Sequence, residues 1–477
     1  MLYLIIFVSL FLRLINLNQS LWLDEAINLN NVRALGFGDL VLKYSLSDFH
    51  PPLYHVILKA NTLLIGSSEL AARLPSVILG VLSVYITYLI GKKLYDKKTA
   101  LIGAVLLATA PLHIYYSQEA RMYMLAAFWA TLSVYFFISL VKKESLFNWL
   151  GFIASTILML YSDYLVYLLL PTYIIYLILF RKNVKRSTII GFIPSFILIF
   201  LALIPWLLIF PKQLHVGLTV ASASPAWANV VGFSDLKNLG LSLVKFTVGR
   251  ISHDNNLIYA ITFLPVGIFV LFLFAISIFR MSKYRSYLQF WFFTPLLLGF
   301  FISFFIPVFV YFRFIFILPA FYLIWASAIN SVNIKKISNT LLLLALFINL
   351  ISTSIYFINS KFHREDWKEA TKFVHQMSND KTIVLFEQEG SMAPFDYYNS
   401  GKVESAGAIK GFSANQMDVK ENIPIVTKNV DKIFLFQYLS GITDPQGILF
   451  QEISNEGFKN ISTKNFNGVG FIYEFIR

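Results

Sequence analysis

Two adjacent carboxylates, Asp24 and Glu25, lie in the stretch SLWLDEA, directly after an apolar segment that begins at Met1. A carboxylate at the edge of a membrane span is partly removed from water, which raises its pKa toward the range that suits a general base. Such a group can accept the proton of an attacking hydroxyl. The alternative is that both acids are solvated residues that only flank the span.

Two further groups of titratable side chains occur in the stretches SDFHPPLYH and LHIYYSQEARMY. The first contains Asp48 and His50, followed by two prolines that favour an extended backbone. The second contains Glu119 and Arg121 in a short turn between two apolar runs. His50 could be a packed loop histidine, and Glu119 and Arg121 could form a structural pair. Because all three groups are predicted on one side of the membrane, we expect a cleft at the membrane surface.

Cationic side chains on the same predicted side can stabilise a departing phosphate. They are Arg33, Lys43, Lys59, Arg73, Arg121, Lys212, Lys237, Lys245, Arg250 and Arg313. Arg313 carries the most weight because VYFRFIFILPA places it inside an apolar run, where an unpaired guanidinium costs roughly 2 to 3 kcal/mol. We therefore expect Arg313 to meet a phosphate or a carboxylate, and an internal salt bridge is the alternative.

The elements that must position these groups are membrane helices. Of the 477 residues, 57% are hydrophobic and only 14% are charged, so lipid must be the solvent for most of the chain. Apolar runs near the length of a membrane-spanning helix recur along the first 360 positions. They predict eleven spans, at 2–17, 70–90, 99–113, 123–141, 146–162, 164–180, 188–210, 257–279, 287–306, 309–330 and 338–357.

The positive charge of the chain is distributed by membrane side. Of the 26 lysines and arginines before position 361, 15 lie in five short connections that fall on one side when the spans alternate. These are Lys92, Lys93, Lys97 and Lys98; Lys142 and Lys143; Arg181, Lys182, Lys185 and Arg186; Arg280, Lys283 and Arg285; and Lys335 and Lys336. The positive-inside rule then predicts a cytoplasmic amino terminus, with the loops 18–69 and 211–256 and the tail outside. The first span reads as an uncleaved anchor, and Arg13 near its outer end is expected to snorkel to the interface.

The composition becomes polar after Phe357, which divides the chain into a membrane catalytic domain, 1–357, and a soluble extracytoplasmic domain, 358–477. Short β-rich runs, TIVLF, KIFLFQ and GVGFIYEF, alternate with helical signals in this tail. One predicted helix has its apolar positions on one face, at Trp367, Ala370, Phe373 and Val374. The predicted fold is a polytopic α-helical membrane protein of about eleven transmembrane helices with a small C-terminal α/β domain.

Several classes of function are excluded. The chain has no cysteine, so disulfides, thiolate metal sites and cysteine nucleophiles are absent. Its basic residues follow the membrane topology, which argues against nucleic acid as a partner. Neither phosphate-binding glycine loop nor an H-E-x-x-H motif occurs. Because nucleotide sugars are cytoplasmic, an activated donor for the outer acids must be carried by lipid.

The sequence resembles the C-type glycosyltransferase (GT-C) superfamily, in the branch of the protein O-mannosyltransferases and the bacterial aminoarabinose transferase. The resemblance is carried by RLINLNQSLWLDEA, by HPPLYHVILK and by the long stretch that begins ARLPSVILG and ends SQEARMYML. It returns in YFRFIFILPAFYLIWA and REDWKEA. It implies a GT-C fold and transfer of a sugar from a polyprenyl-phosphate donor at the extracytoplasmic membrane face.

The resemblance also implies roles for single residues. Asp24 matches the first-loop acid taken as the catalytic base or acceptor-positioning group, and Glu25 matches its neighbour. His50 stands where the aminoarabinose transferase pattern has a lysine before proline that meets the lipid phosphate. Glu119 and Arg121 match the second-loop acidic and basic positions. Some relatives carry a divalent metal near the first-loop acids, but no spacing here requires one, so no cofactor is expected to be required and a divalent metal is left open as an alternative.

The resulting hypothesis is direct displacement at the anomeric carbon with inversion. Asp24 accepts the hydroxyl proton, and His50, Arg121, Arg250 or Arg313 meets the leaving polyprenyl phosphate. The acceptor could be a lipid, a glycan or a protein. A polytopic transporter or lipid flippase is the main alternative, although acids at span ends and the lack of paired halves are atypical of transporters. A non-catalytic membrane scaffold is the third.

Overall fold

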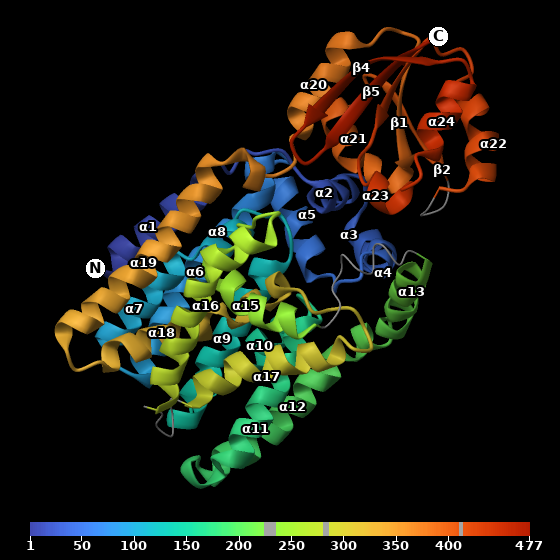
Figure 1. The fold of residues 1–477 in the computed structure, drawn as a ribbon. Helices are drawn as coiled ribbons and strands as arrows, with labels where there is room; N and C mark the ends of the chain where they lie inside the picture. The colour runs from blue at the N-terminus through green and yellow to red at the C-terminus, as the bar shows by residue number, and fades with distance from the viewer. Residues whose placement is uncertain (224–234, 280–285, 410–413) are drawn as a thin grey trace. The chain divides into compact units, whose positions relative to one another are not determined.

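The computed structural model describes residues 1–223, 235–279, 286–409 and 414–477, which form two compact units (Figure 1). The first unit consists of Met1–Leu17, Phe37–Gly217 and the described residues of Val231–Ile358. The second consists of Asn18–Gly36, the described residues of Leu218–Val230, and Asn359–Arg477. The segment with Asp24 and Glu25 therefore belongs to the unit formed by the C-terminal tail. The predicted basic cluster at 280–285 lies outside the described residues.

Each of the eleven predicted spans coincides with a helical segment of the first unit. These segments are α1 (Leu2–Leu14), α6 (Glu69–Leu94), α7 (Lys97–Ala108) with α8 (Pro111–Ser117), α9 (Tyr123–Lys142), α10 (Leu146–Leu160), a 3₁₀ turn (Leu165–Leu169) with α11 (Leu170–Leu179), α12 (Arg186–Leu207), α16 (Asn256–Phe279), α17 (Ser286–Ile302), a 3₁₀ segment (Tyr311–Ile317) with α18 (Leu318–Ser331), and α19 (Lys335–Ile358). Among the described residues, six helices are long and apolar enough to cross a membrane, or seven if α7 and α8, bent by 59°, form one span. The predicted fold class is confirmed.

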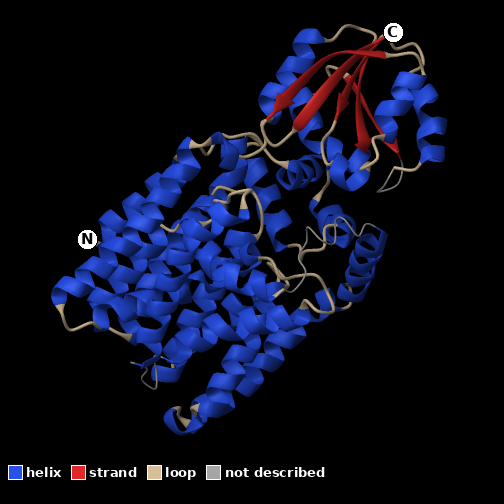
Figure 2. Cartoon of the chain, in the orientation of Figure 1, coloured by secondary structure: helices blue, strands red, loops and turns tan. Residues whose placement is uncertain are grey.

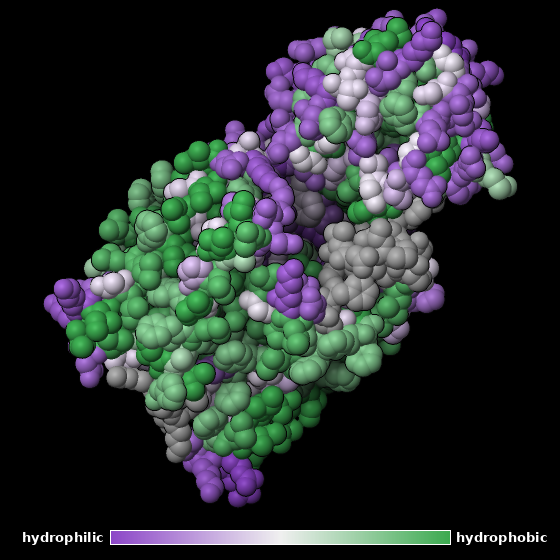
Figure 3. Space-filling view, in the orientation of Figure 1, coloured by the Kyte–Doolittle hydropathy of each residue, from purple (hydrophilic) through white to green (hydrophobic). Residues whose placement is uncertain are grey.

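Apolar side chains cover the outside of the helical unit (Figure 3). Phe200 of α12 and Leu271 of α16, for example, are 58% and 59% exposed. A soluble unit rarely exposes so continuous an apolar surface. The exposed apolar helices support a location in the cell membrane.

Arg13 does not snorkel, and that expectation is wrong. Its side chain is fully buried, with Nη1 donating to the carbonyls of Ser9 at 2.8 Å and Ala108 at 3.1 Å. Its Nη2 lies 2.7 Å from Nδ1 of His113, and its Nε donates to the Ser117 hydroxyl at 3.1 Å. Because neighbouring helices supply acceptors at this depth, the guanidinium is satisfied inside the bundle. His113 is thereby assigned to packing between helices.

The loops predicted on the outer side are largely helical. The segment 18–69 contains α2 (Leu23–Ala34), α3 (Phe37–Asp39), a π-helical turn (Leu40–Tyr44), α4 (Ser45–Ser47) and α5 (Leu53–Ile65). The segment 211–256 includes most of α13 (Phe210–Ala223) and α15 (Leu236–Val248).

The second unit contains the described β-strands (Figure 2). They are β1 (Thr382–Gln388), β2 (Glu404–Ile409), β3 (Lys432–Phe436), β4 (Lys459–Phe466) and β5 (Gly470–Ile476), in the order β2-β1-β3-β5-β4. Strand β1 is parallel to β2 and β3, whereas β5 is antiparallel to both of its neighbours, β3 and β4. The predicted strand runs TIVLF, KIFLFQ and GVGFIYEF are confirmed as β1, β3 and β5.

Both faces of this sheet are covered, as expected of parallel strands. Helices α20 (Trp367–Met377) and α21 (Ala393–Asn399) pack on one face, and α22 (Gln416–Val426) and α24 (Ile448–Asn455) on the other. The predicted face of α20 is correct, because Trp367, Ala370 and Val374 are buried and Phe373 packs against them. Helix α2 joins this core through Leu23 and a 2.8 Å hydrogen bond from the Leu21 N–H to the Tyr398 hydroxyl.

Glu387, at the end of β1, gives the second unit a predictable pH dependence. Burial raises the pKa of Glu387 from 4.5 to about 8. The charge of Asp444 raises this pKa further, whereas a hydrogen bond from Thr443 lowers it. Between these two values the folded state retains a proton that the unfolded state has lost, so stability falls as pH rises. We expect Glu387→Gln to raise the melting temperature of the full-length protein at pH 8.5 and to leave it almost unchanged at pH 4.5.

Differential scanning fluorimetry across this pH range measures the effect, with Glu404→Gln, an exposed carboxyl on β2, as the control. An equal shift of Glu387→Gln at both pH values would contradict the prediction.

Candidate active site

Glu25 and Asp24 have different environments in the first turn of α2. Glu25 is completely buried, and its Oε2 accepts the backbone N–H of Trp22 at 3.4 Å, which caps the helix. Asp24 is partly exposed, and its charge acts on Glu365 and Tyr438. Of the two acids, Asp24 is the one that a substrate can reach.

Glu365, in the REDWKEA stretch, is the centre of a hydrogen-bond network in the second unit. Its carboxylate accepts the Trp367 Nε1–H at 2.8 Å, the Tyr438 hydroxyl at 3.0 Å and the backbone N–H of Leu23. Burial raises its pKa to about 7, although the donors lower it and the charge of Asp24 raises it further. Glu365 thus links the start of α2 to the C-terminal sheet and is poised to change charge near neutral pH.

Asp48 is the centre of a second network, in the first unit. Its Oδ2 lies 2.9 Å from Nε2 of His55 and 3.4 Å from Nδ1 of His50, and its Oδ1 lies 3.5 Å from Nη1 of Arg121. Burial alone would raise the pKa of Asp48, but the Arg121 charge and the two histidines hold it well below its usual range. Arg121 is therefore paired with Asp48 across the chain, and Asp48 is an anion at neutral pH.

His55 has acceptors at both ring nitrogens. The Ser45 hydroxyl donates to the Leu40 carbonyl at 2.8 Å, so its lone pair faces His55 Nδ1 at 3.2 Å, while Nε2 faces Asp48. These two contacts fix the orientation of the imidazole ring. His50 is oriented by its own loop, since its Nδ1 donates to the Asp48 carbonyl at 2.6 Å.

Removing the charge of Asp48 should destabilise the first unit. We expect Asp48→Asn to lower the free energy of unfolding by about 3 to 5 kcal/mol at pH 7, because Arg121 loses a buried counter-charge. The lowered pKa of Asp48 means that this stability is complete above pH about 4 and is lost as pH falls further. Thermal unfolding of the two proteins at pH 7 and pH 3 measures the difference, which should shrink in acid. Equal stability at pH 7 would refute the role of Asp48.

Arg250 lies in a group of tyrosines with Glu119. Its Nη1 donates to the Tyr115 hydroxyl at 2.7 Å, and its guanidinium lies 4.8 Å from the centroid of the same ring. The charge of the buried Glu119 also acts on it. Because Arg250 is exposed, the rest of its guanidinium fork is accessible to an anion.

Lys245, on α15, adds a second cation to this group. Its Nζ donates to the Ile251 carbonyl at 2.7 Å and lies 5.9 Å from the centroid of the Tyr311 ring. Burial, and then the charge of Arg250, lowers its pKa to about 8. An anion bound beside Arg250 would also favour the charged form of Lys245.

Arg313 lies two residues after Tyr311 in the 3₁₀ segment. It is partly buried, and within the described residues its side chain has no hydrogen bond or ion pair. The internal salt bridge considered for this residue is not found in that part of the chain. The segment itself is placed by Phe312, whose ring stacks on Tyr116 at 5.5 Å.

The predicted site residues thus fall into separate groups. Asp24 and Glu25 lie in the second unit, whereas Glu119, His50, Arg121, Arg250 and Arg313 lie in the first. Four participants were not predicted: His55, Asp163, Glu365 and Tyr438. His55 and Glu365 were within quoted motifs, SDFHPPLYH and REDWKEA, but nothing in the sequence distinguishes them from their neighbours. Asp163, whose Oδ2 lies 4.0 Å from Nε2 of His50, carries no sequence signal.

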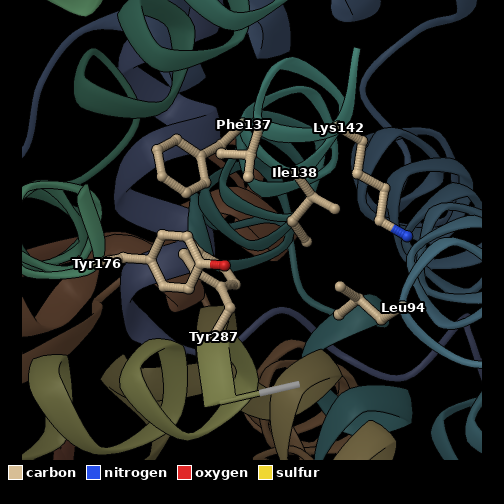
Figure 4. Close-up of a pocket in the computed structure, with 7 residues that line it drawn as sticks. Leu94, Phe137, Ile138, Lys142, Tyr176 and Tyr287 are labelled. Atoms are coloured by element: carbon tan, nitrogen blue, oxygen red, sulfur yellow. The ribbon is translucent and has the colours of Figure 1, made fainter. Parts of the chain in front are cut away.

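No cluster of metal ligands defines the site in the described part of the first unit. Within the described residues, no three His, Asp or Glu side chains are arranged to hold a metal ion. A cavity between α6, α9, α11 and α17 is lined by Phe137, Ile138, Tyr176 and Tyr287 (Figure 4). Its volume of about 10 Å³ has room for one water molecule at most. This cavity is a packing defect.

Comparison with known sequences identifies relatives of the membrane unit. Residues 49–209 match the family of the dolichyl-phosphate-mannose-protein mannosyltransferases. An uncharacterized protein of Aquifex aeolicus is 25% identical over 354 residues, which are 71% of this chain. The match spans 65% of that relative, less than two thirds of its length.

Comparison with solved structures extends the similarity to the whole chain. ArnT from Cupriavidus metallidurans, bound to undecaprenyl phosphate, has a TM-score of 0.62 at 11% identity, over 99% of this chain and 97% of ArnT. The Archaeoglobus fulgidus oligosaccharyltransferase, in complex with Zn and sulfate, has a TM-score of 0.58 at 14% identity, over 99% of this chain and 72% of the enzyme. The same enzyme, AglB, has been solved with an inhibitory peptide and a dolichol-phosphate. These structural similarities confirm the fold that the sequence resemblance implied, a GT-C fold.

Proposed function

We propose that this protein transfers a sugar from a polyprenyl-phosphate donor to an acceptor hydroxyl at the outer face of the membrane. The single observation that carries the proposal is the exposed Arg250, fixed on Tyr115 beside Lys245, in a fold whose solved members bind undecaprenyl phosphate and dolichol-phosphate. Two cations among tyrosine hydroxyls form a suitable site for a lipid-linked phosphate. Arg313, His50 and Arg121 are the further proposed phosphate ligands.

The proposed reaction is a direct displacement. The acceptor oxygen attacks the anomeric carbon, the bond from that carbon to the phosphate oxygen breaks, and the electron pair leaves with polyprenyl phosphate. Asp24 accepts the proton of the attacking hydroxyl, and Arg250 with Lys245 neutralises the leaving phosphate. One displacement inverts the anomeric configuration. No covalent sugar-enzyme intermediate is required, because phosphate is already a competent leaving group.

Glu119 and Glu25 support this chemistry in different ways. Glu119 is buried near Arg250 and orients it by charge, whereas Glu25 caps the helix that presents Asp24. Although a related structure contains Zn, the described residues of this chain offer no ligand set for a metal. We therefore assign no step to a metal ion.

The proposed membrane sidedness follows from the charge distribution. The basic connections between spans favour the cytoplasm, which leaves the networks around Asp48 and Arg250 and the domain 358–477 on the extracytoplasmic side. A hydroxyl of a lipid, a glycan or a protein could serve as acceptor, and the donor sugar could be a hexose or a pentose.

A release assay tests the proposal. Purified full-length protein is incubated with undecaprenyl-phosphate-linked hexoses and pentoses and with a membrane extract as the acceptor source, and free undecaprenyl phosphate is measured by mass spectrometry. We expect release with at least one donor and an inverted anomeric configuration in the product. Movement of an intact donor between leaflets of proteoliposomes, without release, would instead identify a flippase.

A further inference from the structure

The second unit contains an open pocket of about 430 Å³. It lies where the end of β3 and the turn between β4 and β5 meet Glu365. Small-molecule sites commonly have volumes of roughly 300 to 1,000 Å³. The pocket is therefore large enough for a small organic ligand.

The lining of this pocket combines polar and apolar groups and carries no positive charge. Gln437 and Asn465 contribute amide groups, Tyr438 a hydroxyl and Glu365 a carboxyl. Within the described chain, none of the lining residues is lysine or arginine. A phosphate or another anion would find no counter-charge here, whereas sugar hydroxyls, which both donate and accept, match amide and carboxyl groups.

The two most enclosed polar groups are rigidly placed. Tyr438 donates to Glu365, and its ring packs edge-on against Trp367 with centroids 4.8 Å apart. Trp367 in turn stacks on Phe436 at 5.7 Å in the core of the sheet. A preorganised wall of this kind loses little side-chain entropy when a ligand binds.

Two residues of the pocket, Leu439 and Gly468, have positive φ angles, a backbone conformation that is unfavourable for residues other than glycine. Leu439 has a φ of 64°, a left-handed conformation that costs a non-glycine residue on the order of 1 kcal/mol or more. Gly468, with a φ of 74°, passes so close to Glu365 that a Cβ would lie 2.9 Å from its Cγ. Strained and glycine-dependent positions tend to gather at binding sites.

We propose that this pocket binds a neutral carbohydrate unit of the acceptor, with Gln437, Asn465 and Glu365 hydrogen-bonding to its hydroxyl groups. The buried Phe466 and Val469 form an apolar floor for the carbon face of the sugar ring. The role as an acceptor site rests on the proposed glycosyl transfer, whereas carbohydrate binding itself does not.

The position of Asp24 supports the acceptor role. Its charge acts on both Glu365 and Tyr438, and the backbone N–H of Leu23 donates to Glu365. The proposed base is thus adjacent to the enclosed wall of the pocket, in the same unit of the chain. With a pKa of about 7, Glu365 is partly protonated at neutral pH, so it can either donate to or accept from a sugar hydroxyl.

A binding experiment tests the pocket directly. Full-length protein in detergent is applied to an array of neutral hexose and N-acetylhexosamine oligosaccharides, and the affinities of bound glycans are measured by titration. We expect at least one neutral glycan to bind, and Asn465→Ala and Gln437→Ala each to weaken it about tenfold through a lost hydrogen bond. Asn460→Ala, on the same strand as Asn465 but outside the pocket, should bind as the wild type does.

Both truncated side chains are exposed, so the variants should unfold at the wild-type temperature, which thermal unfolding checks. Binding of no neutral glycan, or equal binding by Asn465→Ala, Gln437→Ala and the wild type, would overturn the proposal. If a glycan binds in the pocket but no donor releases undecaprenyl phosphate, the carbohydrate-binding proposal is supported and the proposed glycosyl transfer is contradicted. If transfer proceeds and Asn465→Ala leaves the acceptor KM unchanged, the acceptor role fails.

Discussion

Replacing Asp24 with asparagine should reduce the rate of sugar transfer by about 100-fold to 10,000-fold, the range supplied by a general base. Asparagine has nearly the same shape as aspartate, but its amide oxygen is too weakly basic to take the proton of a hydroxyl. Because the side chain is partly exposed, we expect the variant to express and unfold like the wild type. Release of undecaprenyl phosphate under single-turnover conditions measures the effect on the chemical step.

The matched control for this variant is Asp39→Asn. Asp39 lies in the same predicted outer loop and its side chain is 46% exposed; within the described residues it forms one ion pair, with Lys43 four residues away, at 2.7 Å. It should transfer sugar at the wild-type rate. A fully active Asp24→Asn protein would remove Asp24 from the role of base and direct attention to Glu365, the neighbouring carboxyl.

Replacing Arg250 with methionine should lower kcat/KM for the lipid-linked donor by about 100-fold to 1,000-fold, as expected when a preorganised donor to a developing anion is lost. Arg250→Lys should recover part of the activity, because lysine keeps the charge but lacks the planar fork. The product, undecaprenyl phosphate, shares its phosphate with the donor. Added undecaprenyl phosphate should therefore inhibit Arg250→Met more weakly than it inhibits the wild type. This second readout separates phosphate binding from a general structural defect.

Arg477→Met serves as the control for Arg250. Arg477 also lies over an aromatic ring, 4.4 Å from the centroid of Phe458, but at the exposed end of the C-terminal sheet. Its replacement should leave donor kinetics unchanged. If Arg250→Met retains wild-type inhibition by undecaprenyl phosphate, the phosphate site must be assigned to other cations, with Arg313 as the next candidate.

The membrane architecture could be predicted because hydropathy and span length follow directly from the solvent. All eleven expected spans are helical, and the break between α7 and α8 falls immediately before Pro111, where the ring favours a new helix start. Strands β1, β3 and β5 of the tail could also be predicted from their β-rich runs, whereas β2 and β4 were not predicted. These features depend on local sequence alone.

The pairing of polar groups could not be predicted, because it depends on contacts between distant segments. Asp48 and His55 are seven residues apart in a visible motif, yet it is the bend at 48–52, between α4 and α5, that brings their side chains together. Arg13 was expected at the membrane surface, since the sequence does not show which helices offer it carbonyl oxygens. The association of Asp24 with Glu365 likewise requires the tertiary fold.

The membership of Asn18–Gly36 in the second unit constrains how the protein can be made. Leu21 emerges early from the ribosome, but its partner Tyr398 follows 377 residues later. At a translation rate of about 5 to 20 residues per second, this wait lasts roughly 20 to 75 s. During that time α2 lacks the C-terminal core against which Leu23 packs, so a transcript that stops before codon 359 yields the described helices of the first unit but leaves Asp24 without the second unit to which it belongs.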